Sequence, residues 1–186
     1  MTQTQIASGQ DVVTFLKYQH EQIKALMAEV LEATGSQREE AFTKLRRLLA
    51  VHETAEEEVV HPKARKVLDN GDDVVSQRLE EENEGKQALS ELEKLDVNST
   101  DFEKNFREFQ KDVLEHAESE EHEEFAQLAD KLEDAQLERM RSAVKLAEST
   151  APTRPHPGVE SATANLLAGP FASMMDRARD LITGKR

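Results

Sequence analysis

The sequence predicts an all-α protein folded as an up-down-up-down four-helix bundle, and three observations support this prediction. Glycine and proline are rare before residue 150, and clusters of β-branched residues are few, so the composition favours helices. Apolar residues recur three and four positions apart over four long segments, as in helices that bury one face. Only short turn signals separate these segments, and such short connections are typical of a bundle.

The first expected helix runs from about Asp11 to Thr34 and ends at Gly35. The second is expected to begin with a capping box formed by Ser36 and Glu39. A strong turn signal, Asp69-Asn70-Gly71, ends the second helix. Within it, Pro62 is expected to bend the helix or break it late, because proline lacks the backbone donor that a helix interior needs.

The third expected helix runs from about Asp72 to Leu95. The fourth opens with a second capping box at Thr100 and continues past Leu132. Its C-terminal part, to about Glu148, either continues this helix or forms a separate one. The bundle is therefore expected to occupy residues 1–148.

Residues 149–186 are expected to form a separate appendage. The stretch STAPTRPHPG, residues 149–158, predicts an extended Pro-rich linker. An amphipathic segment comes after it and is expected to form a short helix that docks on the bundle or on a second subunit. Binding to a membrane surface is a weaker alternative, because the segment is short of Lys and Arg.

Charge and composition exclude several classes of function. The net charge is -14, and residues 1–148 hold about -16 of charge because the remainder is slightly basic, which argues against nucleic acids and anionic membranes as partners. The absence of cysteine removes disulfides, iron–sulfur clusters and thiolate chemistry, and it suits the cytoplasm. We see no signal peptide and no apolar run near the ~20 residues that span a bilayer. A cytoplasmic monomer or homodimer is expected.

A repeated phrase, His-x-x-x-Glu, carries the functional signal. It occurs at His52 and Glu56 and again at His116 and Glu120, each time within a strongly helical segment. Residues four apart on a helix lie on one face, so each pair can bind a cation from one side. Two such helices facing each other would enclose the cation.

Two further polar residues interrupt the apolar stripes, His20 in the first helix and Glu82 in the third. Burying a carboxylate without a partner costs several kcal/mol or forces it to take a proton. Three such acids would threaten a fold whose total stability is only ~5–15 kcal/mol. No Arg is expected on these stripes and only Lys86 comes close, so metal ions are the expected compensation.

The donor set of three imidazoles and three carboxylates indicates which metal is expected. It is too rich in carboxylate for structural zinc and too rich in nitrogen for calcium, so iron, or less favourably manganese, fits best. Two ferric ions with an oxo or hydroxo bridge would balance the three carboxylates and leave one or two coordination positions open. An open position implies reaction with a small molecule.

Three segments resemble the hemerythrin-like (HHE cation-binding) family: LKYQHEQIKAL, HETAEEEVVHP and HAESEEHEEFAQL. The segment TRPHPGVESATAN, followed by LLAGP, resembles the tail of actinobacterial, mycobacterial-type members. The resemblance of the three segments covers about residues 11–135. It implies a four-helix bundle with a non-haem di-iron centre, with ligands at His20, His52, Glu56, His116 and Glu120. A ferritin-like ferroxidase ranks well below, because its Glu-x-x-His signature has the reverse order and a shorter spacing.

The third helix departs from the family pattern. Anchored on Lys86 and Leu89 of EEENEGKQALSEL, the histidine position of the family falls on Glu82. Anionic oxygen ligands stabilise ferric iron more than imidazole does. The substitution therefore disfavours reversible oxygen storage and favours irreversible reaction with oxygen, peroxide or nitric oxide.

His61 is ambiguous. On an ideal helix it lies about 180° around the axis from His52, but Pro62 disfavours α-helical geometry at His61. It is therefore considered as a ligand or as a neighbour of the ligands. Tyr18 points away from His20 on the same ideal helix.

Other residues receive smaller roles. His122 is expected to be solvated, and His156 lies in the linker. Possible hydrogen-bond acceptors for the ligand imidazoles are Glu53, Glu57 and Glu121.

The function expected from these residues is reaction with hydrogen peroxide, in a catalase-like manner, or with nitric oxide, in defence against oxidative or nitrosative stress. The alternative is a protein that senses or stores oxygen or iron without turnover. A metal-free bundle that acts through its C-terminal segment is a third possibility.

Overall fold

Cap geometry decides where the helices begin. The Asp11 side chain accepts a hydrogen bond from the Thr14 backbone N–H at 3.0 Å and so caps the first helix. The two predicted capping boxes are wrong. Gly35, at a φ of +60°, already begins the second helix, and its N–H donates to Asn98 Oδ1 at 2.7 Å. Ser99, not Thr100, caps the later helix by accepting from the Phe102 N–H.

The computed structural model describes residues 11–153, and all elements in this range are helical. They are, in chain order, α2 (Val12–Glu32), α3 (Gly35–Ala55), η1 (Glu56–Val60), α4 (His61–Val67), α5 (Gly71–Leu92), α6 (Thr100–Ser119), η2 (Glu120–Phe125), α7 (Ala126–Lys131) and α8 (Asp134–Thr150). The segments η1 and η2 are π-helical.

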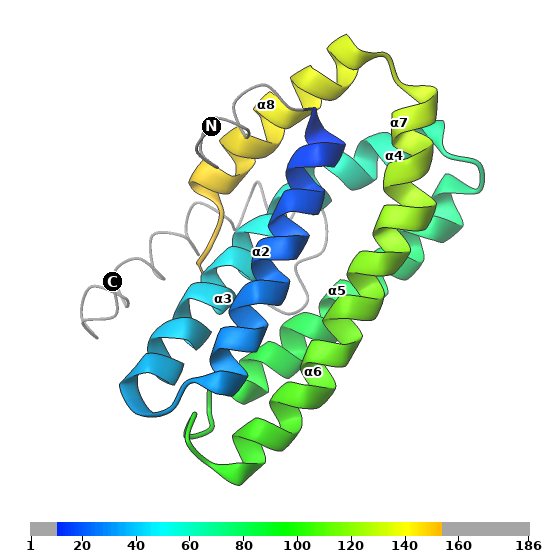
Figure 1. Ribbon diagram of the computed structural model, residues 1–186. Coiled ribbons are helices and arrows are strands. Elements are labelled where there is room, and N and C mark those ends of the chain that lie inside the picture. Colours follow the sequence, from blue (N-terminus) through cyan, green and yellow to red (C-terminus); the bar gives the residue numbers. More distant parts are fainter. Residues whose placement is uncertain (1–10, 154–186) are drawn as a thin grey trace.

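The predicted four-helix bundle is confirmed. Its members are α2, the continuous run α3–η1–α4, α5, and the continuous run α6–η2–α7, which lie side by side in alternating directions (Figure 1). The chain turns tightly into α5, where Asn70 is left-handed and a Cβ on Gly71 would lie 2.7 Å from the Arg65 carbonyl oxygen.

The second predicted helix does not break at Pro62. Pro62 lies in the first turn of α4, directly after η1, and the chain stays helical to Val67. At the junction the His61 N–H bonds the Glu56 carbonyl five residues earlier, and Pro62 follows in the first turn of α4, where proline is tolerated.

The helix α8 is separate from the fourth bundle helix, which was one of the two alternatives. It packs against α2, α3 and η1, and Figure 1 shows it turning back from α7 toward the start of α2. The predicted linker begins too early, because α8 continues to Thr150. The rest of the linker from residue 154 on, and the predicted C-terminal amphipathic helix, lie outside the described residues. No helix within residues 11–153 is both long enough and apolar enough to cross a membrane.

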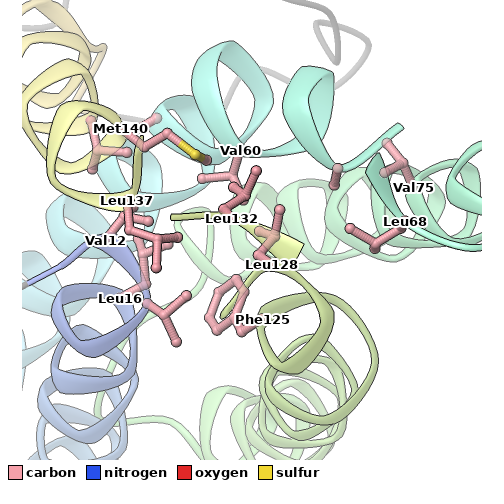
Figure 2. Close-up of a cluster of buried hydrophobic side chains, with 14 of the residues drawn as sticks. Val12, Leu16, Val60, Leu68, Val75, Phe125, Leu128, Leu132, Leu137 and Met140 are labelled. Carbon is pink, nitrogen blue, oxygen red and sulfur yellow. The ribbon is translucent and has the colours of Figure 1, made fainter. Parts of the chain in front are cut away.

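The core consists of two apolar clusters. The first, here called the α8 cluster, joins Leu137 and Met140 of α8 to Val12, Val60 and residues of α7, as Figure 2 shows. The second, here called the Phe cluster, fills the opposite end of the bundle; its aromatic members are Phe42, Phe102, Phe106 and Phe109. Both clusters follow the predicted three-and-four spacing, and a polar layer lies between them.

Candidate metal centre

Each bundle helix contributes to the polar layer. His20 comes from α2 and Glu82 from α5, as expected from their places on apolar stripes. The two His-x-x-x-Glu pairs lie at the junctions α3–η1 and α6–η2. The structure thus brings together all seven predicted site residues: His20, His52, Glu56, His61, Glu82, His116 and Glu120.

One group of four residues surrounds the first cation position. Ligand atoms of His20, His52, Glu56 and Glu120 all lie within 4.8 Å of one another. The two imidazole Nε2 atoms of His20 and His52 are 3.1 Å apart. His20 Nε2 is 3.4 Å from Glu120 Oε2, and His52 Nε2 is 3.3 Å from Glu56 Oε2. Two imidazoles and two carboxylates therefore face one point.

A second group surrounds a neighbouring position. It comprises His61, Glu82 and Glu120, with His61 Nε2 at 2.5 Å from Glu82 Oε1. His116 Nε2 lies 3.5 Å from Glu120 Oε1 and would complete this group. Glu120 belongs to both groups, so its two oxygens can bridge two cations.

Several donor atoms in this layer are buried without a hydrogen-bond partner among the described residues. They are both carboxylate oxygens of Glu56, both of Glu120, Glu82 Oε2 and His116 Nε2. Leaving a buried carboxylate oxygen unpaired costs about 1–3 kcal/mol or more. Because all these atoms surround the same two positions, the residues present fit a pair of cations.

Each of the four imidazoles has its Nδ1 atom held by an acceptor on the outer side. Such bonds fix the ring and, when the imidazole is neutral, leave the lone pair on Nε2 for a metal. The pairs are His20–Glu121 at 2.9 Å, His52–Gln19 at 3.0 Å, His61–Glu124 at 3.0 Å and His116–Glu81 at 2.8 Å.

Only one of these four acceptors, Glu121, was predicted. Glu57 instead pairs with Lys86. Gln19, Glu81 and Glu124 were missed, although Gln19 and Glu81 each directly precede a predicted ligand in the sequence. Each of them serves a histidine on a different helix, so spacing along one helix could not reveal the role.

The π-helical segments explain the position of His61. Each segment begins at the glutamate of a His-x-x-x-Glu pair, Glu56 or Glu120. A π turn carries about one extra residue, which rotates the residues after it by roughly 100° relative to an α-helix. His61 therefore turns from the face that an ideal α-helix would give it to the interior, where it is 2% exposed.

Burial controls the electrostatics of the layer. It lowers the pKa of His52 to about 3, with the neighbouring His20 adding to the effect, so the His52 imidazole is neutral. Burial also raises the pKa of Glu56 well above its ordinary value, reinforced by Glu120 and Glu82.

The expectation that no Arg lies on the inward stripes is wrong for α5. Arg78 of α5 is 1% exposed and donates to Glu81 at 2.6 Å and to Glu123 at 2.9 Å. Lys86 is also buried. Arg78 binds acids outside the two metal groups and Lys86 pairs with Glu57, so neither hydrogen-bonds the oxygens of Glu56 and Glu120.

A cavity of about 330 Å³ leads to this layer between α5 and α6. Its inner wall includes His116 and Glu120. A Cβ on Gly85, also in the wall, would meet nothing within 4 Å. Exposed carboxylates surround the outer end, here called the acidic rim: Glu84, Asp112 and Glu115.

The remaining histidines and the tyrosine lie outside the two groups. His122 is exposed, as predicted, and hydrogen-bonds the Glu118 carbonyl at 2.8 Å. Tyr18 is 39% exposed, in agreement with its predicted outward direction. His156 falls outside the described residues.

Comparisons with known proteins show the fold and the family of this chain. A crystal structure of a hemerythrin HHE cation-binding domain-containing protein from Mycobacterium kansasii is similar in fold, with a TM-score of 0.68 at 18% identity over 91% of this chain and 98% of that one. A curated relative from Nostoc sp., named DNA nickase, is 25% identical over 150 residues. The match covers 80% of this chain but 42% of that relative's length. The sequence model of the hemerythrin HHE cation-binding domain matches residues 11–128, and the chain belongs to this family.

Proposed function

We propose that this protein holds two iron ions and reacts with a small neutral oxidant, hydrogen peroxide or nitric oxide, in defence against oxidative or nitrosative stress. The observation that supports the proposal most directly is the pair of adjoining donor groups that share Glu120. Four imidazoles and three carboxylates form a mixed nitrogen and oxygen set, which suits iron better than zinc or calcium.

The chain's own residues would each perform a defined task. Glu120 would hold the two ions together, and Glu56 would add a negative charge to the first position. The four imidazoles, kept in one tautomer by their outer acceptors, would complete the donor set. When bound, two irons supply redox chemistry and coordination positions open to a small molecule.

The cavity supports the choice of substrate class. It is large enough for a molecule of two to four atoms but has an acidic rim, which repels anions such as superoxide and admits neutral molecules. Hydrogen peroxide needs no external electron donor, because two molecules disproportionate to two waters and one dioxygen, one being oxidised and the other reduced.

Neither nucleic acid nor a membrane belongs to this proposal. The word nickase in the name of the Nostoc relative describes that longer protein, of which this chain covers less than half. The strongly acidic charge of this chain opposes contact with a phosphate backbone.

The test begins with the iron-to-protein ratio and the visible spectrum of the purified protein. About two irons per chain, with oxygen evolution from hydrogen peroxide or consumption of nitric oxide and no loss of iron, would support the proposal. A protein that binds iron and forms a stable oxygenated species without turnover would instead support oxygen sensing or storage. A protein with no iron, and no gain in stability when iron is added, would contradict a metal function altogether.

A further inference from the structure

The helix α8 lies beyond residues 11–128, which match the family, yet it reaches the polar layer. The contact is a chain of two hydrogen bonds. Gln19 Nε2 donates to Glu148 Oε1 at 2.6 Å, and Gln19 Oε1 is 3.0 Å from His52 Nδ1. Gln19 is 5% exposed, so water does not easily replace either partner.

The Gln19 amide has a donor end and an acceptor end, so its orientation decides what each neighbour receives. An ionised carboxylate only accepts hydrogen bonds, so Glu148 selects the NH₂ end of the Gln19 amide. The amide oxygen then faces His52 and accepts its Nδ1–H. This leaves the lone pair on His52 Nε2, the atom that points toward His20 and Glu56.

Reversing the amide would have the opposite effect. The NH₂ group of Gln19 would face Nδ1 and favour the tautomer that carries its proton on Nε2. That tautomer cannot bind a cation at the first position. The acceptor at Glu148 therefore controls a metal ligand two hydrogen bonds away.

We propose that Glu148 is a positioning residue of the metal centre: through Gln19 it holds His52 in the metal-binding tautomer. The helix α8 thereby contributes to metal binding. The inference rests on the proposed function only in treating His52 as a metal ligand. Docking of α8 does not depend on Glu148, because Leu137, Met140, Val144 and Ala147 supply the apolar contact.

The first experiment measures binding of iron(II) alone to the metal-free protein, with Glu148→Ala compared with Glu138→Ala. Glu138 lies on the same helix and is exposed, so its substitution changes the charge equally. Loss of an outer partner of a metal-bound histidine commonly lowers metal affinity about 10–100-fold. We expect such a loss for one of the two ions in Glu148→Ala and none in Glu138→Ala.

A double-mutant cycle separates this role from a general weakening of the fold. If Glu148 acts through Gln19, then adding Glu148→Ala to Gln19→Ala causes no further loss of affinity. Circular dichroism of the metal-free variants checks that α8 stays folded. Additive losses, or equal affinities of Glu148→Ala and Glu138→Ala, would overturn the inference.

A second measurement needs no metal. Nitrogen-15 spectra of histidine-labelled, metal-free protein report which ring nitrogen of His52 carries the proton. Wild type is expected to show a single Nδ1–H tautomer, and Glu148→Ala a mixture. An unchanged tautomer in that variant contradicts the inference even if iron binds, whereas a wild type that binds no iron contradicts only the proposed function.

Discussion

The Phe cluster and the polar layer are built on the same four helices, but different forces stabilise them. In the Phe cluster the rings of Phe102 and Phe106 stack at 5.5 Å, and Phe42 meets Phe102 edge-on at 5.0 Å. Every buried group there gains from leaving water. In the polar layer, Glu56 and Glu120 are fully buried with unpaired oxygens.

Burial alone favours the packing of the Phe cluster, whereas the polar layer buries oxygen atoms that a bound cation would pair with. Apolar contacts supply most of the favourable free energy of folding. The metal-free polar layer lowers that free energy, because it buries oxygen atoms without hydrogen-bond partners. A bound cation would stabilise the layer, because it would pair with the buried oxygens of Glu56 and Glu120 that have no hydrogen-bond partner among the described residues.

The largest expected effect comes from replacing the residue that both groups share. Glu120→Ala removes a ligand from each cation position, so we expect loss of both irons, measured as the iron-to-protein ratio. Glu118→Ala is the matched control, since Glu118 lies on the outer side of the same helical run and belongs to neither donor group. Retention of one tightly held iron in Glu120→Ala would show that the two positions do not share this carboxylate.

Truncation in the Phe cluster should have the reverse pattern. Phe106 is fully buried, so Phe106→Ala is expected to lower the free energy of unfolding by about 3–5 kcal/mol, through lost apolar burial and a cavity. The variant should still bind two irons, because no Phe cluster ring belongs to either donor group. Leu146→Ala, at an exposed position, should change stability little. Denaturant unfolding and an iron assay measure the two quantities. A Phe106→Ala protein that is fully folded but has lost iron would contradict the separation of the two regions.

The smallest expected effect is the pH dependence of the metal-free protein. Burial opposes charge on His116, but Glu120 and Glu81 raise its pKa to about 9, and burial raises the pKa of Glu57 to about 8. Both folded-state values exceed the unfolded ones, so the folded state binds more protons than the unfolded state between pH 7 and 9. The free energy of unfolding should therefore fall over this range, by on the order of 1–3 kcal/mol.

Iron should flatten this dependence, because ligands that hold a cation no longer take up protons. The comparison requires urea unfolding of the metal-free and iron-loaded protein at several pH values. Stability of the metal-free protein that rises from pH 7 to 9 would show that other groups dominate its titration.

Much of the architecture could be predicted because it depends on local periodicity. The apolar spacing identified four bundle helices, and turn signals near Gly35 and Gly71 placed two of their ends. Six polar site residues were visible for the same reason, since His20, Glu82 and the two His-x-x-x-Glu pairs interrupt regular stripes. The predicted capping box at Ser36 was wrong, because Asn98, in a loop distant in sequence, accepts a hydrogen bond from the Gly35 N–H at the start of this helix.

The sequence by itself therefore determined the fold class, the cation-binding chemistry and the approximate depth of the site, since side-chain type and helical period are local properties. The tertiary structure alone decided that His61 faces inward, because this depends on a π turn whose extra residue no helical wheel includes. It also decided which acceptors hold the imidazoles, because Gln19, Glu81 and Glu124 each reach a histidine on another helix. Such pairings arise only when the helices pack, and they link α8 to the centre of the bundle.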